Sequence, residues 1–168
     1  MLCLIAKLDD TATETLAALR RALPGGAGKP LYGHVTLAAY TGEDEAGFLR
    51  GCRELLAGLS AFSLRIETLE VLEETSILVA LPEKAGALDA LHHRRVAARF
   101  GGELDKWTRD ESWLPHVTLF YGPEADLPAL RRQLDARFRP FSARVVALEF
   151  SRVLDPGYEI ADRVLLPD

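Results

Sequence analysis

The sequence has few of the features that mark secreted, metal-binding or membrane-spanning chains. It holds two cysteines, Cys3 and Cys52, at a spacing that fits neither a zinc site nor a redox motif. We expect two small core residues in a reducing compartment, with a disulfide as the less favoured alternative. No run of eighteen apolar residues occurs, and the first residues carry no basic leader. These absences predict a cytoplasmic protein with no membrane span and no signal peptide.

Positive charge is also scarce. Lys and Arg number 20 against 25 Asp and Glu, which gives a net charge of −5. A protein that grips the backbone of a nucleic acid needs clustered cations, so we expect no extended nucleic-acid surface. A small phosphorylated ligand or the end of an RNA stays compatible with this charge. The length of 168 residues and the 48% hydrophobic content suit one domain with a sizeable core.

One tetrapeptide stands out because it occurs twice. His-Val-Thr-Leu occupies residues 34–37 and again residues 116–119, an offset of 82 residues (116 − 34). Each copy lies in apolar, β-branched surroundings and predicts a strand. Side chains on a strand alternate between its two faces. The histidine and threonine of each copy therefore share one face, and the valine and leucine turn the other way.

This combination of side chains suits a phosphate ester. An imidazole, with a pKa of about 6.5, can act as an acid or a base near neutral pH, and a threonine hydroxyl can donate to a phosphate oxygen. Two facing strands would bring His34, Thr36, His116 and Thr118 to one phosphorus atom. A lone His-x-Thr is most often structural, and the duplication is what favours catalysis. Because zinc-ligand spacing is lacking, we expect no metal and no cofactor.

A longer repeat lies downstream of each copy. FSLRIETLEV at residues 62–71 matches FSARVVALEF at residues 141–150, an offset of 79 residues (141 − 62). In both segments the apolar alternation changes parity midway, which is typical of a β-bulge. We interpret the segments that end at Pro82 and Pro167 as matching return strands. Each half then carries a motif strand, a helix, a long strand and a return strand.

The remaining periodicity completes the predicted fold. We expect one α+β domain over residues 1–168, with two lobes of about 1–74 and 75–168 related by a pseudo-twofold axis. Antiparallel sheets would line a central cleft, with helices packed outside. The predicted strands are 2–8, 33–40, 62–71, 77–81, 114–121, 141–154 and 158–166, and the predicted helices are 11–23, 43–58, 83–100 and 127–138.

Four aromatic residues flank the motifs and are candidates for binding the substrate: Tyr40, Trp113, Phe120 and Tyr121. Strict alternation places Tyr40 and Phe120 on the histidine face, and Tyr121 away from it unless a bulge intervenes. Stacking on a nucleobase contributes about 1–3 kcal/mol. Core packing is the equal alternative for each of these residues.

Other polar residues receive a structural interpretation. Leu88, His92 and Val96 share one helical stripe, so we expect His92 to pack in the core rather than bind a metal. Lys106 and Arg109 precede the second motif. We interpret them as part of a solvated loop, with phosphate binding as the alternative.

The paired motifs resemble the two-histidine (2H) phosphoesterase superfamily, which includes the 2'-5' RNA ligase family and RNA 2',3'-cyclic phosphodiesterases. The resemblance covers nearly the whole chain in length, motif spacing and repeat pattern. It implies metal-independent hydrolysis of a 2',3'-cyclic phosphate or a related nucleotide or RNA phosphodiester, with 2'-5' ligation as the reverse reaction. It also implies that His34 is the acid and His116 the base, with Thr36 and Thr118 on the phosphate oxygens.

Two positions depart from the family pattern. Bacterial cyclic phosphodiesterases of this group often carry Arg five residues after the second histidine and an aromatic residue five after the first. This chain has Tyr121 and Ala39 there. These departures bear on RNA as the substrate, because the catalytic pairs are intact. The alternative function is a module that binds a nucleotide or an RNA end without turnover, which would need the threonines but not both histidines. We expect a monomer in either case.

Overall fold

The computed structural model describes residues 1–24, 32–83, 86–154 and 157–168. Within these residues seven strands form one antiparallel sheet, so the predicted mixed fold of helices and antiparallel strands is confirmed. The strands are β1 (Leu2–Leu8), β2 (His34–Tyr40), β3 (Phe62–Leu72), β4 (Ile77–Pro82), β5 (Val117–Tyr121), β6 (Phe141–Leu154) and β7 (Gly157–Leu165). The helices are α1 (Asp10–Arg21), α2 (Glu45–Leu56), α3 (Ala87–Leu91), α4 (Ala98–Phe100) and α5 (Leu127–Asp135), with short 3-10 turns at Glu73–Thr75 and Gly101–Glu103.

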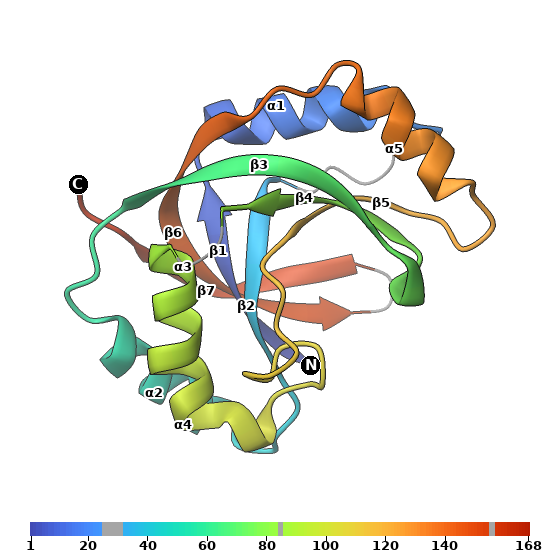
Figure 1. The fold of residues 1–168 in the computed structure, drawn as a ribbon. Helices are drawn as coiled ribbons and strands as arrows, with labels where there is room; N and C mark the ends of the chain where they lie inside the picture. The colour runs from blue at the N-terminus through green and yellow to red at the C-terminus, as the bar shows by residue number, and fades with distance from the viewer. Residues whose placement is uncertain (25–31, 84–85, 155–156) are drawn as a thin grey trace.

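Strand β6 lies at the centre of the sheet. The strand order is β2-β1-β6-β3-β4-β5, and β7 also pairs with β6. One edge of β6 pairs with β1 along residues 145–152. The other edge is shared, because β3 pairs with residues 141–145 and β7 with residues 147–154. The sheet is strongly curved, with α1 and α5 at one end and α2, α3 and α4 at another (Figure 1).

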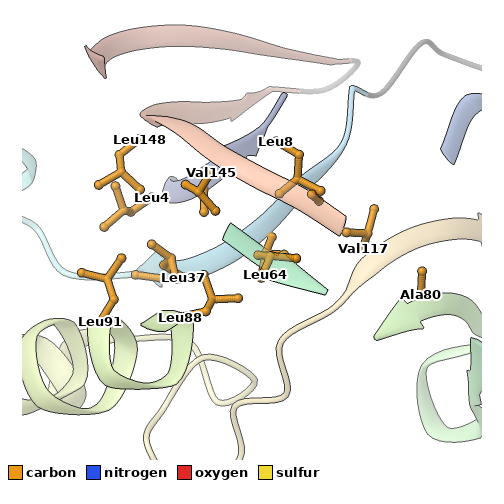
Figure 2. Packing of buried hydrophobic residues seen from close by; sticks show 14 of the residues in the cluster. Leu4, Leu8, Leu37, Leu64, Ala80, Leu88, Leu91, Val117, Val145 and Leu148 are labelled. Carbon is orange, nitrogen blue, oxygen red and sulfur yellow. The ribbon is translucent and has the colours of Figure 1, made fainter. Parts of the chain in front are cut away.

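The main core lies between the sheet and the helices. Alternate residues of β1 enter it, and Leu4 and Leu8 meet Leu37, Val145 and Leu148 there (Figure 2). Each of these side chains is almost fully removed from water, which contributes roughly 1.5–3 kcal/mol per large apolar side chain. This burial fixes which face of β1, β2 and β6 turns away from the helices.

The two cysteines lie in different apolar clusters and are not bonded to each other. Cys52 packs in the main core, and Cys3 packs with Ile5 and Ala39 on the opposite face of the sheet. Burial raises the pKa of Cys3 to about 11 and that of Cys52 to about 12. The prediction that both are buried core residues is confirmed.

Helices α1, α2 and α5 begin in the same way. Each follows an aspartate whose carboxylate accepts a hydrogen bond from the backbone N–H three residues later, which satisfies one of the exposed donors of the first turn. The three pairs are Asp9 with Ala12 at 3.0 Å, Asp44 with Gly47 at 2.8 Å, and Asp126 with Ala129 at 2.9 Å. Asp9 also accepts from the backbone N–H of Arg144 at 2.6 Å, which ties α1 to β6.

Both predicted parity changes in the long strands are bulges. Glu67 is the extra residue in the ladder between β3 and β4, and Val146 is the extra residue in the ladder between β6 and β1. The two positions differ by 79 residues (146 − 67), the offset of the sequence repeat. The internal repeat therefore extends to the irregular backbone of each long strand.

The return strands predicted at 77–81 and 158–166 are present, each antiparallel to the long strand before it, but the two are not equivalent in the sheet. β4 lies between β3 and the motif strand β5, whereas β7 pairs with β6. The counterpart of β4 is β1, which lies between β6 and the motif strand β2. The shared Leu-Pro ending suggested otherwise, because the partners of a strand depend on its place in the sheet and not on its last residues.

The helix predicted over residues 83–100 is irregular where the structure describes it, and residues 84–85 lie outside the described residues. α3 continues as a π-helical segment, His92–Ala97, before α4. A π-helical turn shifts the side chains that follow it. The expected strand at 114–121 starts later, at Val117, so His116 precedes β5.

Candidate active site

The two motif strands are the two end strands of the sheet order, β2 and β5. The sheet curves until these ends come back into contact with each other. His34 and Thr36 come from β2, Thr118 comes from β5, and His116 lies directly before it. All four side chains are partly buried. The curvature therefore brings together residues that are 82 positions apart (116 − 34).

Each motif contains a bulge that the sequence did not reveal. Leu37 and Leu119, the last residue of each motif, are skipped in the ladders to β1 and β4. A bulge places two consecutive residues opposite one partner and reverses the alternation beyond it. Residues after the bulge therefore face the opposite way from the strict-alternation prediction.

This reversal corrects the predicted roles of Tyr40 and Phe120. Tyr40 is 3% exposed, and its ring stacks on Phe48 with ring centroids 4.4 Å apart. Its hydroxyl donates to the Glu103 carboxylate at 2.6 Å. Phe120 packs against the same core. Neither residue lines the histidine face, whereas Tyr121 is turned to the face of Thr118 and is 67% exposed.

Trp113 is also a structural residue rather than a base-stacking one. It is 8% exposed, and its indole stacks on the His92 ring at 3.9 Å. Its Nε1 donates a 2.9 Å hydrogen bond to the carbonyl of Thr36. With one face covered by His92 and its donor used, Trp113 supports β2 from behind the motif.

The two histidines are held in the same way. His34 Nδ1 lies 3.1 Å from the carbonyl of Tyr32, and His116 Nδ1 lies 2.8 Å from the carbonyl of Leu114. A carbonyl oxygen can only accept, so each Nδ1 carries a proton and donates it. Nε2 is therefore the nitrogen that each imidazole has for proton transfer.

Burial lowers the pKa of both imidazoles below the ordinary 6.5, since it disfavours the charged form. At His34 the positive charges of Arg20 and His116 lower the pKa further, while the Tyr32 carbonyl and Glu149 oppose the shift. At His116 the Leu114 carbonyl opposes it. Both rings are therefore mostly neutral at neutral pH, and a bound anion would favour their protonation.

Arg20 connects α1 to the second motif. Its Nη2 donates a 2.6 Å hydrogen bond to the carbonyl of Thr118. The carbonyl of Thr36 is held by Trp113 in the same fashion. Each motif is thus anchored at its threonine carbonyl by a side chain from the other half of the chain.

Residues 8–156 match the model of the 2'-5' RNA ligase superfamily. The chain belongs to this superfamily. Its members are two-histidine phosphoesterases and ligases, so membership identifies an enzyme of this general class. The family predicted from the paired motifs is confirmed.

Solved structures share the fold of this 2'-5' RNA ligase superfamily member. The protein TT0787 of Thermus thermophilus is 20% identical with a TM-score of 0.68, covering 98% of this chain and 97% of that one. E. coli LigT complexed with NADP+ is 19% identical with a TM-score of 0.66, and the match covers 99% of this chain and 97% of that one. E. coli LigT complexed with 3'-AMP is 20% identical with a TM-score of 0.66, and the match covers 99% of this chain and 98% of that one. No curated protein sequence matches the chain.

Sequence reasoning missed a polar group beside His34 in this superfamily member. The Tyr32 ring lies 5.6 Å from the His34 ring, and its hydroxyl donates to Glu149 at 2.5 Å. Glu149 is 0% exposed and also pairs with Arg163 Nε at 2.6 Å. The signal was present, because the 141–150 repeat aligns Glu149 with Glu70 and places a carboxylate on a central strand.

The remaining candidates have structural partners. His92 is 0% exposed, as predicted, and its Nε2 donates to the Thr108 carbonyl at 2.9 Å. His93 pairs with Asp110. Nitrogen atoms of His92 and His93 and a carboxylate oxygen of Asp110 all lie within 4.8 Å of one another. Lys106 and Arg109 are exposed, in keeping with a solvated loop. Among the described helices, none combines the length and apolar character needed to cross a bilayer.

Two hollows differ in their relation to the motifs. The larger, of about 980 Å³, lies between α1 and the segment 137–141 and includes no residue of either motif. A second, of about 500 Å³, is lined in part by His116. Size alone therefore does not identify the functional hollow, and the second one adjoins the candidate catalytic residues.

Proposed function

We propose that this enzyme is a metal-independent cyclic phosphodiesterase that opens a 2',3'-cyclic phosphate, or a related nucleotide or RNA phosphodiester, with water. The observation that supports this most directly is the matched fixing of His34 and His116 through Nδ1. It leaves two Nε2 atoms for proton transfer near one phosphate. One imidazole can serve as base and the other as acid, which are the two functions that hydrolysis requires.

The proposed reaction is a displacement at phosphorus. A water oxygen forms a bond to phosphorus while the bond to one ribose oxygen breaks. By similarity to the family, Nε2 of His116 takes the proton from water, and Nε2 of His34 gives a proton to the leaving ribose oxygen. The hydroxyls of Thr36 and Thr118 donate to the non-bridging oxygens, where negative charge increases in the transition state.

The same residues would support ligation. When the 5'-hydroxyl of a second ribose replaces water as the nucleophile, His116 takes the proton of that hydroxyl and His34 protonates the departing 3' oxygen of the cyclic phosphate. The product is then a 2'-5' bond rather than a free phosphate monoester. The two directions differ in the nucleophile and not in the catalytic groups. Substrate trials, rather than the positions of His34 and His116, therefore decide between hydrolase and ligase.

The test is a panel of substrates with matched variants. Candidate substrates are an RNA ending in 2',3'-cyclic phosphate, a 2',3'-cyclic mononucleotide and a 2'-5' dinucleotide. His34→Asn and His116→Asn each retain an amide N–H near the position of Nδ1, so the bond to the carbonyl can persist while Nε2 is lost. His93→Asn, a histidine change outside both motifs, is the control. We expect turnover by the wild type and the control, and none by the two motif variants.

Thr36→Val and Thr118→Val test the phosphate contacts. A hydrogen bond to a charged group contributes about 1.5–3 kcal/mol, so each change should lower kcat/KM roughly 10- to 150-fold. Binding of a cyclic nucleotide without turnover by the wild type would instead support the binding-module alternative. Loss of turnover on adding EDTA would contradict the metal-independent mechanism.

A further inference from the structure

The hollow beside His116 is bounded mainly by apolar side chains. It has a volume of about 500 Å³, within the range of small-molecule sites. Its walls come from the end of β3, the start of β4 and the loop that leads to the second motif. The apolar residues that form it are Val71, Leu72, Ile77, Trp107 and Leu114.

Two of these side chains are unusually exposed for their size. Trp107 is 46% exposed and Leu114 is 38% exposed. Covering apolar surface is favourable by about 25 cal/mol per Å². A ligand group that covers Trp107 and Leu114 would therefore gain binding free energy next to a histidine of the motif.

Trp107 has the features of a stacking platform. It lines the hollow, and the Lys106 ammonium lies over its ring at 4.6 Å from the centroid. Exposed aromatic rings of this kind bind nucleobases by stacking, for about 1–3 kcal/mol per base.

The lining also limits what can bind. The residues that line it include neither Lys nor Arg, and Glu74 contributes a negative charge at the wall. Away from His116, these walls favour an uncharged group over a phosphate, which binds best to paired cations. An uncharged flat group fits the apolar walls, and the Lys106 ammonium near Trp107 is not among the lining residues.

We propose that this hollow binds the nucleobase of the substrate, so that the enzyme acts on nucleoside phosphate esters and discriminates against base-free sugar phosphates. The proposal rests on the proposed phosphodiesterase function. The phosphate lies at the two motifs, and the base lies against Trp107 on the His116 side. Specificity then comes from stacking rather than from contact with the nucleic-acid backbone.

The experiment compares two substrates across four proteins. The substrates are 2',3'-cyclic AMP and a base-free ribose 2',3'-cyclic phosphate. The proteins are the wild type, Trp107→Ala, Trp107→Phe and Leu165→Ala, the last an exposed apolar residue outside this hollow. We expect Trp107→Ala to lower kcat/KM for cyclic AMP about 5- to 150-fold and leave the base-free substrate unchanged. Trp107→Phe should lower kcat/KM for cyclic AMP by a smaller factor than Trp107→Ala, because a phenyl ring can still stack. Leu165→Ala should have the kcat/KM of the wild type on both substrates.

Equal loss on both substrates, or no loss on either, would overturn the base site. A binding measurement separates this result from failure of the proposed function. Calorimetry with adenosine 3'-monophosphate and ribose 5-phosphate should show that Trp107→Ala weakens binding of the first ligand alone. If the wild type turns over neither cyclic phosphate but this difference persists, the base site stands and the phosphodiesterase proposal fails.

Discussion

The indole nitrogen of Trp113 lies 2.9 Å from the carbonyl oxygen of Thr36, although the two residues are 77 positions apart. Arg20 makes the matching contact to the carbonyl of Thr118, across 98 positions. Each contact crosses from one half of the chain to the other. Each motif is therefore contacted at its threonine carbonyl by a side chain that belongs to neither motif.

Replacing Trp113 with phenylalanine should loosen the first motif. The variant retains an aromatic ring against His92 but removes the donor to Thr36. Leaving a buried carbonyl without its partner costs about 1–3 kcal/mol. We expect a loss of stability of that size in urea unfolding, together with a lower kcat. The exposed change Trp107→Phe is the stability control, and an unchanged kcat in Trp113→Phe would show that the contact does not position β2.

The positive charge of Arg20 should affect how kcat/KM depends on pH. That charge lowers the pKa of His34, so Arg20→Met should raise this pKa and move the corresponding limb of kcat/KM to higher pH. Arg20→Lys retains a positive charge and should move it less. Identical profiles for the wild type and Arg20→Met would contradict an electrostatic effect of Arg20 on His34.

The pH optimum of the wild type should lie on the acid side of 6.5. In the free enzyme the pKa values of His34 and His116 are both below 6.5, and the reaction needs one ring protonated. The competent fraction therefore declines as pH rises above these values. Because kcat/KM reports the free enzyme, its optimum should fall below that of kcat, where the bound phosphate raises both pKa values. An optimum of kcat/KM above pH 7 would contradict the direction of the shifts.

Stability should fall on acidification through the same pH range. His34, His92 and His116 have pKa values below the 6.5 of an unfolded chain, so the unfolded state binds protons first as pH decreases. The stability that these three neutral histidines allow is fully present above pH 6.5, and the free energy of unfolding decreases progressively below it. Unfolding free energies measured at pH 7.5 and pH 5.5 should show this loss. His92→Gln should show a smaller difference between the two pH values, and an equal one would argue against a buried neutral His92.

A leaving group that needs no proton tests which histidine is the acid. With a p-nitrophenyl phosphodiester, the variant that lacks the acid should recover activity relative to the wild type, and the variant that lacks the base should not. We expect recovery in His34→Asn. Recovery in His116→Asn alone would instead give His116 the acid role. That outcome would not bear on the proposed nucleobase site at Trp107.

The long strands and their bulges could be predicted because the sequence alternates there. The parity changes at Glu67 and Val146 are visible in segments where polar residues separate the apolar ones. The bulges at Leu37 and Leu119 are not visible in the sequence. HVTLAAY and HVTLFYG have no polar residue after the threonine that would reveal the reversed side-chain alternation. Repetition singled out the four motif residues as candidates, whereas the hidden bulges caused Tyr40 and Phe120 to be assigned to the wrong face.

Contacts between distant segments account for the other misses. Tyr32 meets Glu149 across 117 positions, and no local pattern connects them. The place of β1 as the counterpart of β4 follows from pairing with β6, a strand that begins at residue 141. Side-chain alternation reports the burial of one strand at a time, so it cannot give the order of strands.

The central place of β6 has a consequence for how the chain folds. β1 and β3 both pair with β6, and the sheet order places no direct pairing between them. Synthesis proceeds from the N-terminus, so β1 to β5 emerge before the strand that joins them. Until residues 141–154 are made, β1 and β3 each present an open edge that can pair with other chains. Assembly of the site is therefore a late, long-range event, of the kind that folds slowly.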